Sequence, residues 1–124
     1  MLFRSAILCN AASTALALGD FPQTRTLLRG LMDTTRERGL RPLELEALAV
    51  YARLLMLIGR PVEASELTGV LSVHLHQAAV ETRLNSLLDS LSSTLDLETF
   101  AAAHSRGKLL DVETALSNAL KDLR

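Results

Sequence analysis

Three glycine-to-proline breaks divide the first half of the chain into segments of similar length. The breaks are Gly19-Asp20-Phe21-Pro22, Gly39-Leu40-Arg41-Pro42 and Gly59-Arg60-Pro61. Glycine ends helices because it adopts the left-handed conformation without a Cβ penalty, and proline suits the first turn of the next helix, where no backbone donor is needed. The breaks predict helices near 3–18, 22–38, 43–58 and 62–75, joined by short turns that favour antiparallel neighbours.

The composition favours helices over strands. The 124 residues include 28 Leu and 16 Ala, which are strong helix formers, whereas Val and Ile together contribute 8. We therefore expect an all-α fold and a single domain spanning 1–124, without a linker. The lone Cys9 excludes an internal disulfide and favours the cytoplasm. The formal net charge of −1 disfavours nucleic acid as a partner, and no apolar run approaches the roughly 20 residues that cross a bilayer, so we expect no membrane partner.

The four predicted helices form two similar units, at about 3–38 and 43–75. Gly19 and Gly59 stand at equivalent places in these units, as expected for two copies of a helical hairpin. Gly30 and Gly69 fall inside the second helix of each unit, where a glycine costs about 1 kcal/mol. We expect close packing of a neighbouring helix to compensate at both positions.

Residues from about 77 to 124 follow a different pattern, which predicts a C-terminal cap. Its first helix has one apolar stripe, formed by Val80, Leu84, Leu87, Leu88, Leu91 and Leu95. Two shorter helices follow, the first opened by Asp96 and closed before Gly107, the second opened by Asp111. The last helix has an apolar stripe of its own, formed by Val112, Ala115, Leu116, Ala119, Leu120 and Leu123.

Two stretches resemble a known kind of repeat protein. The turn Gly19-Asp20-Phe21, and Gly59 with Ala64 after it, resemble the turns of tetratricopeptide (TPR) repeats. The run from Glu98 to Gly107, followed by 110–115 and 119–120, resembles the tail of bacterial LuxR-like and STAND ATPase regulators, approximately E-x-F-A-A-A-W-x-x-G and then E-x-A. The resemblance implies a right-handed TPR-like superhelix that senses a protein or effector for the upstream domains of a longer signalling or transcriptional regulator.

Stacked helix pairs present their first helices on a concave face, which is the expected binding surface of such an array. Mapping the repeat onto the chain places six candidate contact residues there: Cys9, Ser13, Leu16, Glu46, Arg53 and Met56. This face would bind a protein or peptide, with Arg53 as its cation. The alternative is that Leu16 and Met56 belong to the core and that Cys9 is a small packed thiol.

The rival hypothesis is a self-association domain without a ligand groove. Repeat arrays need polar caps at both ends, yet the first helix carries Leu2, Phe3 and Ile7 with nothing before it. We therefore expect this end either to continue into upstream repeats of a parent chain or to pair with a second copy as a homodimer.

The charged and histidine groups give little support for catalysis. His74 and His76 would point about 200° apart on a helix, which disfavours a shared metal, and His104 has no nucleophile beside it in the sequence. The glutamate pairs Glu44 with Glu46 and Glu63 with Glu66 lie in first helical turns, where the helix dipole favours acids. We expect no catalytic residue, no metal and no cofactor.

The most basic stretch of the chain is a helical stripe of Arg25, Arg29 and Arg36. It would suit a phosphate or an acidic peptide. However, Asp33 lies between the last two arginines, and the stripe approaches a helix C-terminus, where basic residues are expected. We expect a solvated face held by salt bridges.

Overall fold

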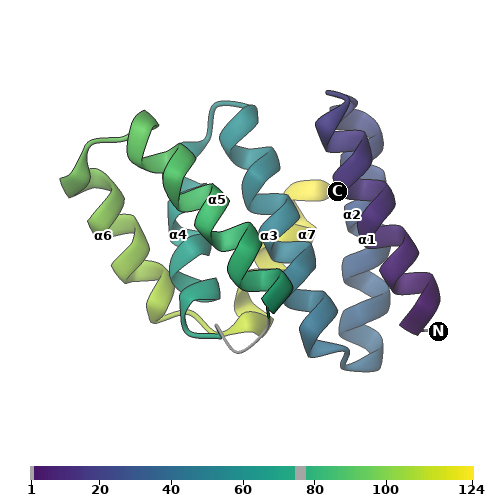
Figure 1. The fold of residues 1–124 in the computed structure, drawn as a ribbon. Coiled ribbons are helices and arrows are strands. Elements are labelled where there is room, and N and C mark those ends of the chain that lie inside the picture. The colour runs from purple at the N-terminus through teal and green to yellow at the C-terminus, as the bar shows by residue number, and fades with distance from the viewer. Residues whose placement is uncertain (1, 75–77) are drawn as a thin grey trace.

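The computed structural model describes residues 2–74 and 78–124, with side chains for 4–74 and 80–124. This part of the chain forms seven helices and no strand, so the all-α prediction is confirmed (Figure 1). The helices are α1 (Leu2–Ala17), α2 (Phe21–Arg38), α3 (Arg41–Leu57), α4 (Pro61–Ser72), α5 (Ala78–Thr94), α6 (Leu97–Lys108) and α7 (Val112–Leu123).

The three predicted breaks end helices as expected. Gly19, Gly39 and Gly59 have positive φ angles of 76°, 66° and 87°, in the left-handed region that favours glycine. A proline follows in the first turn of α2, α3 and α4. Backbone preferences of a few local residues are therefore sufficient to account for these breaks.

The helices lie in two layers with α3 at the centre. The front layer holds α1, α3 and α5 side by side, and the back layer holds α2, α7, α4 and α6 in that order (Figure 1). α2 and α4 do not touch each other, because α7 returns along the back of α3 and lies between them. The last helix is thus packed into the middle of the array, far from α6 to which it is joined.

The closest backbone contact joins α4 to α6 at two glycines. A Cβ on Gly107 would lie 1.7 Å from the carbonyl oxygen of Glu66, and one on Gly69 would lie 2.0 Å from that of His104. The close packing expected at Gly69 is confirmed. The helix was predicted to end before Gly107, but Gly107 lies inside α6. Its lack of a side chain lets the backbones of α6 and α4 meet there.

The expectation of a closely packed neighbouring helix is wrong for Gly30. This glycine is exposed, and no atom of a packing neighbour lies within 4 Å of the position of a Cβ. α5 and α6 share little contact although they are consecutive, because α6 packs along α4 instead.

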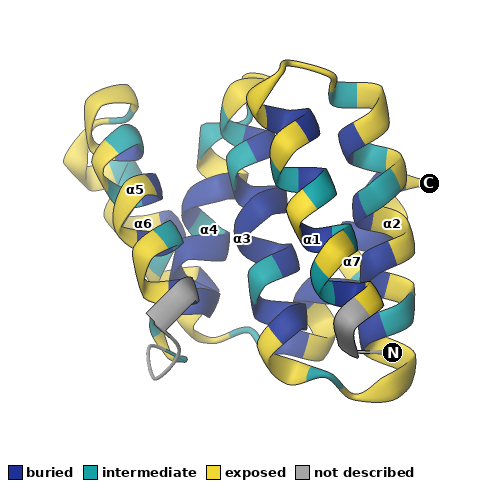
Figure 2. Ribbon diagram, turned by 45° about the vertical axis from the view of Figure 1, so that its right-hand side comes forward, coloured by how far each residue is buried: buried dark blue, intermediate teal, exposed yellow. Residues whose placement is uncertain are grey.

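The core lies between the layers and along α3, where inward-facing side chains are buried (Figure 2). The predicted stripes are confirmed: Val80, Leu84, Leu87 and Leu91 of α5 are buried, and so are all six stripe residues of α7. Leu88 and Leu95 are only half-buried. Among the described helices, none is both long enough and apolar enough to cross a membrane.

Candidate functional site

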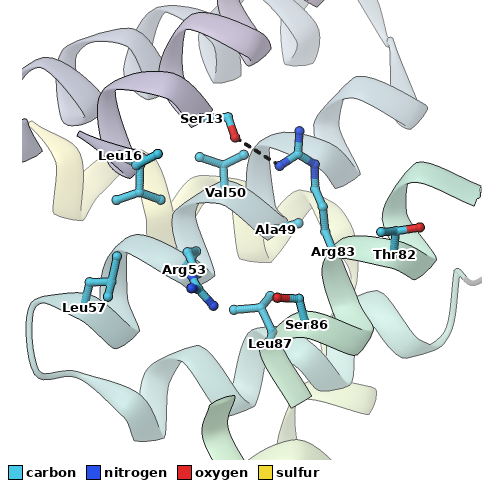
Figure 3. A pocket seen from close by; sticks show the side chains of 11 residues that line it. Ser13, Leu16, Ala49, Val50, Arg53, Leu57, Thr82, Arg83, Ser86 and Leu87 are labelled. Atoms are coloured by element: carbon cyan, nitrogen blue, oxygen red, sulfur yellow. Dashed lines mark hydrogen bonds between the residues drawn. The ribbon is translucent and has the colours of Figure 1, made fainter. Parts of the chain in front are cut away.

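A cavity of about 610 Å³ opens on the front layer, over α3 and between α1 and α5 (Figure 3). α1 and α5 each pack on α3, and their backbones stay apart, although Arg83 of α5 reaches across to the Ser13 hydroxyl of α1. The middle of α3 is left as the floor between them. Eleven residues line the cavity: Ser13, Leu16, Ala17, Ala49, Val50, Arg53, Leu57, Thr82, Arg83, Ser86 and Leu87. A volume of this size is typical of sites that hold a small molecule.

The two sides of this front cavity differ in chemistry. Leu16 and Leu57 lie at one end, where α1 and α3 finish, and the α5 side presents Thr82, Arg83 and Ser86 (Figure 3). Arg53 rises from the floor between them. The front cavity therefore offers an apolar surface beside a cationic and hydroxyl-rich one, with all eleven lining residues free of carboxylates.

The two arginines of the cavity are held in different ways. Arg53 donates from Nη1 to the Ser90 hydroxyl at 3.1 Å and has no carboxylate within ion-pair distance among the described residues. Arg83 donates to the Ser13 hydroxyl at 3.3 Å, and its Nε lies 3.8 Å from Glu46 Oε1. The positive charge of Arg83 is thus partly balanced by Glu46, which does not line the cavity. The charge of Arg53 has no such partner among the described residues.

Three of the six residues predicted for the concave face line this cavity, namely Ser13, Leu16 and Arg53. Cys9 is only 2% exposed and belongs to the core, where burial, together with the nearby Glu46 carboxylate, raises the pKa of its thiol despite the opposing charge of Arg83. Met56 packs half-buried against the core. Leu16 fits both alternatives given above, because it is buried in the core and also lines the cavity.

The α5 side of the cavity was missed by sequence reasoning. Thr82, Arg83, Ser86 and Leu87 belong to the helix predicted as a cap, and Arg53 was expected to be the only cation of the face. The feature of the sequence that could have indicated this side is Arg83, a cation that stands one turn before Leu87 and beside the apolar stripe. Its neighbours α1 and α3 are distant in sequence, so only the fold brings them together.

A second, smaller cavity of about 240 Å³ lies on the back, among α3, α4 and α7. Its centre is Asp122, whose carboxylate accepts from the Tyr51 hydroxyl at 2.6 Å and from Arg60 Nη1 at 3.0 Å. Arg25 Nη2 donates to the Asp122 backbone carbonyl at 2.6 Å. These bonds hold the end of α7 to α2, α3 and the turn before α4.

The hydrogen bonds also change the acidity of the two groups. Burial acts to raise the pKa of Asp122, but the donors on Tyr51 and Arg60 outweigh it, so the pKa lies below its usual value. Burial and the bond to Asp122 raise the pKa of Tyr51. A neutral phenol and an ionised carboxylate are both stabilised, which suits a structural contact between helices.

The other predicted groups are dispersed. Each glutamate of the two pairs meets a different arginine: Glu44 with Arg41, Glu46 with Arg83, Glu63 with Arg60, and Glu66 with Arg106. The pairs therefore do not converge on one point. Of the basic stripe, Arg25 reaches Asp122, while Arg29 and Arg36 are exposed and form no ion pair with Asp33, contrary to expectation.

The histidines give no shared site within the described residues, where no group of three metal-binding side chains gathers. His76 lies outside those residues, so the question of a pair with His74 stays open. His104 is half-buried against α4, stacked on Phe100 with ring centroids 5.3 Å apart, and its Nδ1 lies 2.8 Å from the Thr68 hydroxyl. Burial, aided by Lys108, lowers its pKa.

The predicted self-association end is only partly visible. The side chains of Leu2 and Phe3 lie outside the described residues, whereas Ile7 is 51% exposed on the outer side of α1.

Comparisons with protein-family profiles, with curated proteins and with solved structures find no match to this chain. A function for it must be argued from the chemistry of its own residues.

Proposed function

We propose that the chain is a non-catalytic binding module that holds a protein segment, peptide or small effector in the front cavity. The observation that carries this proposal is the cavity of about 610 Å³ over α3, which presents an apolar end and two arginines. Sites for ligands combine a largely apolar lining with a few polar groups that set orientation. The dispersal of the glutamates among separate arginines favours binding over acid–base catalysis.

We also propose that the array is a TPR-like superhelix from the C-terminal part of a cytoplasmic bacterial regulator. The adjacency of α1 and α3 in the front layer, each followed by a partner behind it, supports stacked helix pairs. The tail from Glu98 to Gly107, which resembles that of LuxR-like and STAND regulators, supports the parent protein. The return of α7 between α2 and α4 is a departure from simple stacking, in which successive second helices touch.

The test is a selection of ligands with a matched pair of blocked and unblocked variants. Ser86 is exposed and lines the cavity, so Ser86→Trp fills the cavity without disturbing the core. Asn85 is also exposed on α5 but does not line the cavity, and Asn85→Trp is the control. Peptides selected from a displayed library on the unmodified chain should lose binding to Ser86→Trp and keep it on Asn85→Trp. Equal binding to both variants contradicts the proposal.

Self-association through α1 is a second candidate, favoured by the half-exposed Ile7 at the edge of the array. α1 packs on α2 and α3 and accepts a hydrogen bond at Ser13 from Arg83 of α5, whereas Ile7 is left exposed in the described structure. Light scattering should then show a dimer that Ile7→Asp converts to a monomer. A strict monomer at high protein concentration, with a folded α1, contradicts this candidate.

A further inference from the structure

We propose that the front cavity recognises a small amphipathic carboxylate, a molecule with an aliphatic chain and one terminal carboxylate. This inference rests on the proposed function and names the chemical class of its ligand. Three observations carry it: the charge of the lining, the position of the apolar surface, and the way the chain itself fills the opposite side of α3.

The charge of the lining favours an anion. Two guanidinium groups, those of Arg53 and Arg83, line the cavity and no carboxylate does. Arg53 uses Nη1 on the neutral Ser90 hydroxyl, so its charge lacks a balancing acid among the described residues. Guanidinium binds carboxylates through paired, charge-assisted hydrogen bonds, and the Ser86 hydroxyl beside it supplies a further donor.

The apolar surface favours an aliphatic chain on the same ligand. Leu57 is 46% exposed and faces the cavity together with Leu16, Ala17 and Val50. Leu16 and Leu57 lie at the end of the cavity away from Arg83 and Thr82 (Figure 3). A ligand that spans both ends would cover the apolar surface with its chain while its carboxylate lies near Arg53.

The gap behind α3 is also lined by apolar and cationic residues, and there the chain itself fills it. There, α7 brings an apolar stripe against the core, and its Asp122 carboxylate accepts from Tyr51 and Arg60. The space between α2 and α4 is thus filled by a helix whose apolar stripe lies beside a carboxylate, that of Asp122, paired with Arg60. The corresponding space between α1 and α5 has apolar and cationic residues of the same kind, so a matching ligand is an apolar molecule with one carboxylate.

The first experiment measures octanoate binding by calorimetry and by amide chemical shifts. We expect shifts confined to α1, α3 and α5, and an affinity at least about tenfold above that of 1-octanol, which lacks the charge. Octylammonium, of opposite charge, and acetate, without the chain, should each bind at least about tenfold more weakly than octanoate. Equal binding of octanoate and octanol overturns the inference, and so does binding at another site.

The second experiment assigns the two halves of the ligand to residues. Arg53→Gln keeps a side chain of similar shape without the charge and should weaken octanoate binding about tenfold, whereas Arg29→Gln, on the exposed side of α2, should not change it. Leu57→Asn should weaken octanoate but leave butyrate nearly unchanged, because the shorter chain covers less apolar surface. Unchanged octanoate affinity in Arg53→Gln overturns the inference.

The outcomes also separate this inference from the proposed function. If displayed peptides discriminate Ser86→Trp from Asn85→Trp but octanoate does not bind, the ligand class is wrong and the binding module stands. If neither peptides nor octanoate reach the cavity, both are wrong.

Discussion

The front and back of α3 face similar gaps, and only the back one is filled by the chain. On the back, α2 and α4 are separated and α7 lies between them. On the front, the backbones of α1 and α5 are likewise separated, with the Arg83 side chain reaching across to Ser13, and a cavity of about 610 Å³ remains. The back gap therefore shows what a stable occupant of such a space requires, which is apolar area together with a partner for each buried polar group.

The residues around the two gaps differ in whether their polar and apolar groups are covered by the chain. Behind α3, Asp122 satisfies both Tyr51 and Arg60, so the network is closed within the chain. In front of α3, Arg53 bonds to the Ser90 hydroxyl and pairs with no carboxylate among the described residues, and Leu57 remains 46% exposed. Stability is therefore concentrated behind α3, and the capacity to bind is concentrated in front of it. Four experiments test this division.

The largest effect is expected at the glycine contact of the back layer. Gly107→Ala places a Cβ 1.7 Å from the Glu66 carbonyl oxygen. The α6 backbone fixes the position of this Cβ and the oxygen belongs to the α4 backbone, so neither can shift cheaply. We expect a loss of at least about 4 kcal/mol in the free energy of unfolding, or release of α6 from α4. Urea denaturation measures the loss. The control is Gly30→Ala, at an open helical position, which should stabilise the protein by about 0.5–1 kcal/mol.

A leucine deletion compares the two sides directly. Leu116 of α7 is fully buried, so Leu116→Ala should cost about 3 kcal/mol through lost burial and a residual cavity. The same change at Leu57, in the front cavity, should cost less than about 1 kcal/mol because the side chain is half in water. Thermal unfolding of the two variants gives the order. Similar losses at both positions contradict the division between the layers.

The acid dependence of the Asp122 contact gives a smaller effect. Its pKa is depressed in the folded protein, so the stability it contributes is complete above its unfolded value of about 3.9 and is lost as the pH falls through the folded value. Asp122→Asn should cost about 1–2 kcal/mol at pH 7 and less at pH 3. Urea titrations at both pH values measure this. Asp89→Asn, an exposed carboxylate on α5, should show no such pH-dependent difference.

The smallest effect on stability is expected at Arg53. Its side chain bonds to the half-buried Ser90 and pairs with no carboxylate among the described residues, so Arg53→Gln should change the free energy of unfolding by less than about 0.5 kcal/mol. The same variant is expected to weaken octanoate binding. A large loss of stability without loss of binding would instead assign Arg53 to the scaffold.

The sequence allowed more of the fold to be predicted than of the candidate site. Gly19, Gly39 and Gly59 specify breaks through their own φ angles, and the stripes of α5 and α7 specify buried faces through helical spacing. Gly30 and Gly107 were interpreted wrongly, because a glycine in a sequence does not reveal whether a second backbone lies against it. Ser13, Leu16 and Arg53 were placed on one face from the repeat spacing, and the structure brings them to one cavity.

Local preference thus determined the helices, their ends and their apolar sides, because caps, turns and periodicity act over a few residues. The tertiary structure decided where those sides meet. It packed α6 on α4 through two glycines, returned α7 to the back of α3, and placed Arg83 opposite Ser13, which is 70 residues away. These contacts depend on how helices distant in sequence fill space together, and no single stretch of sequence contains that information.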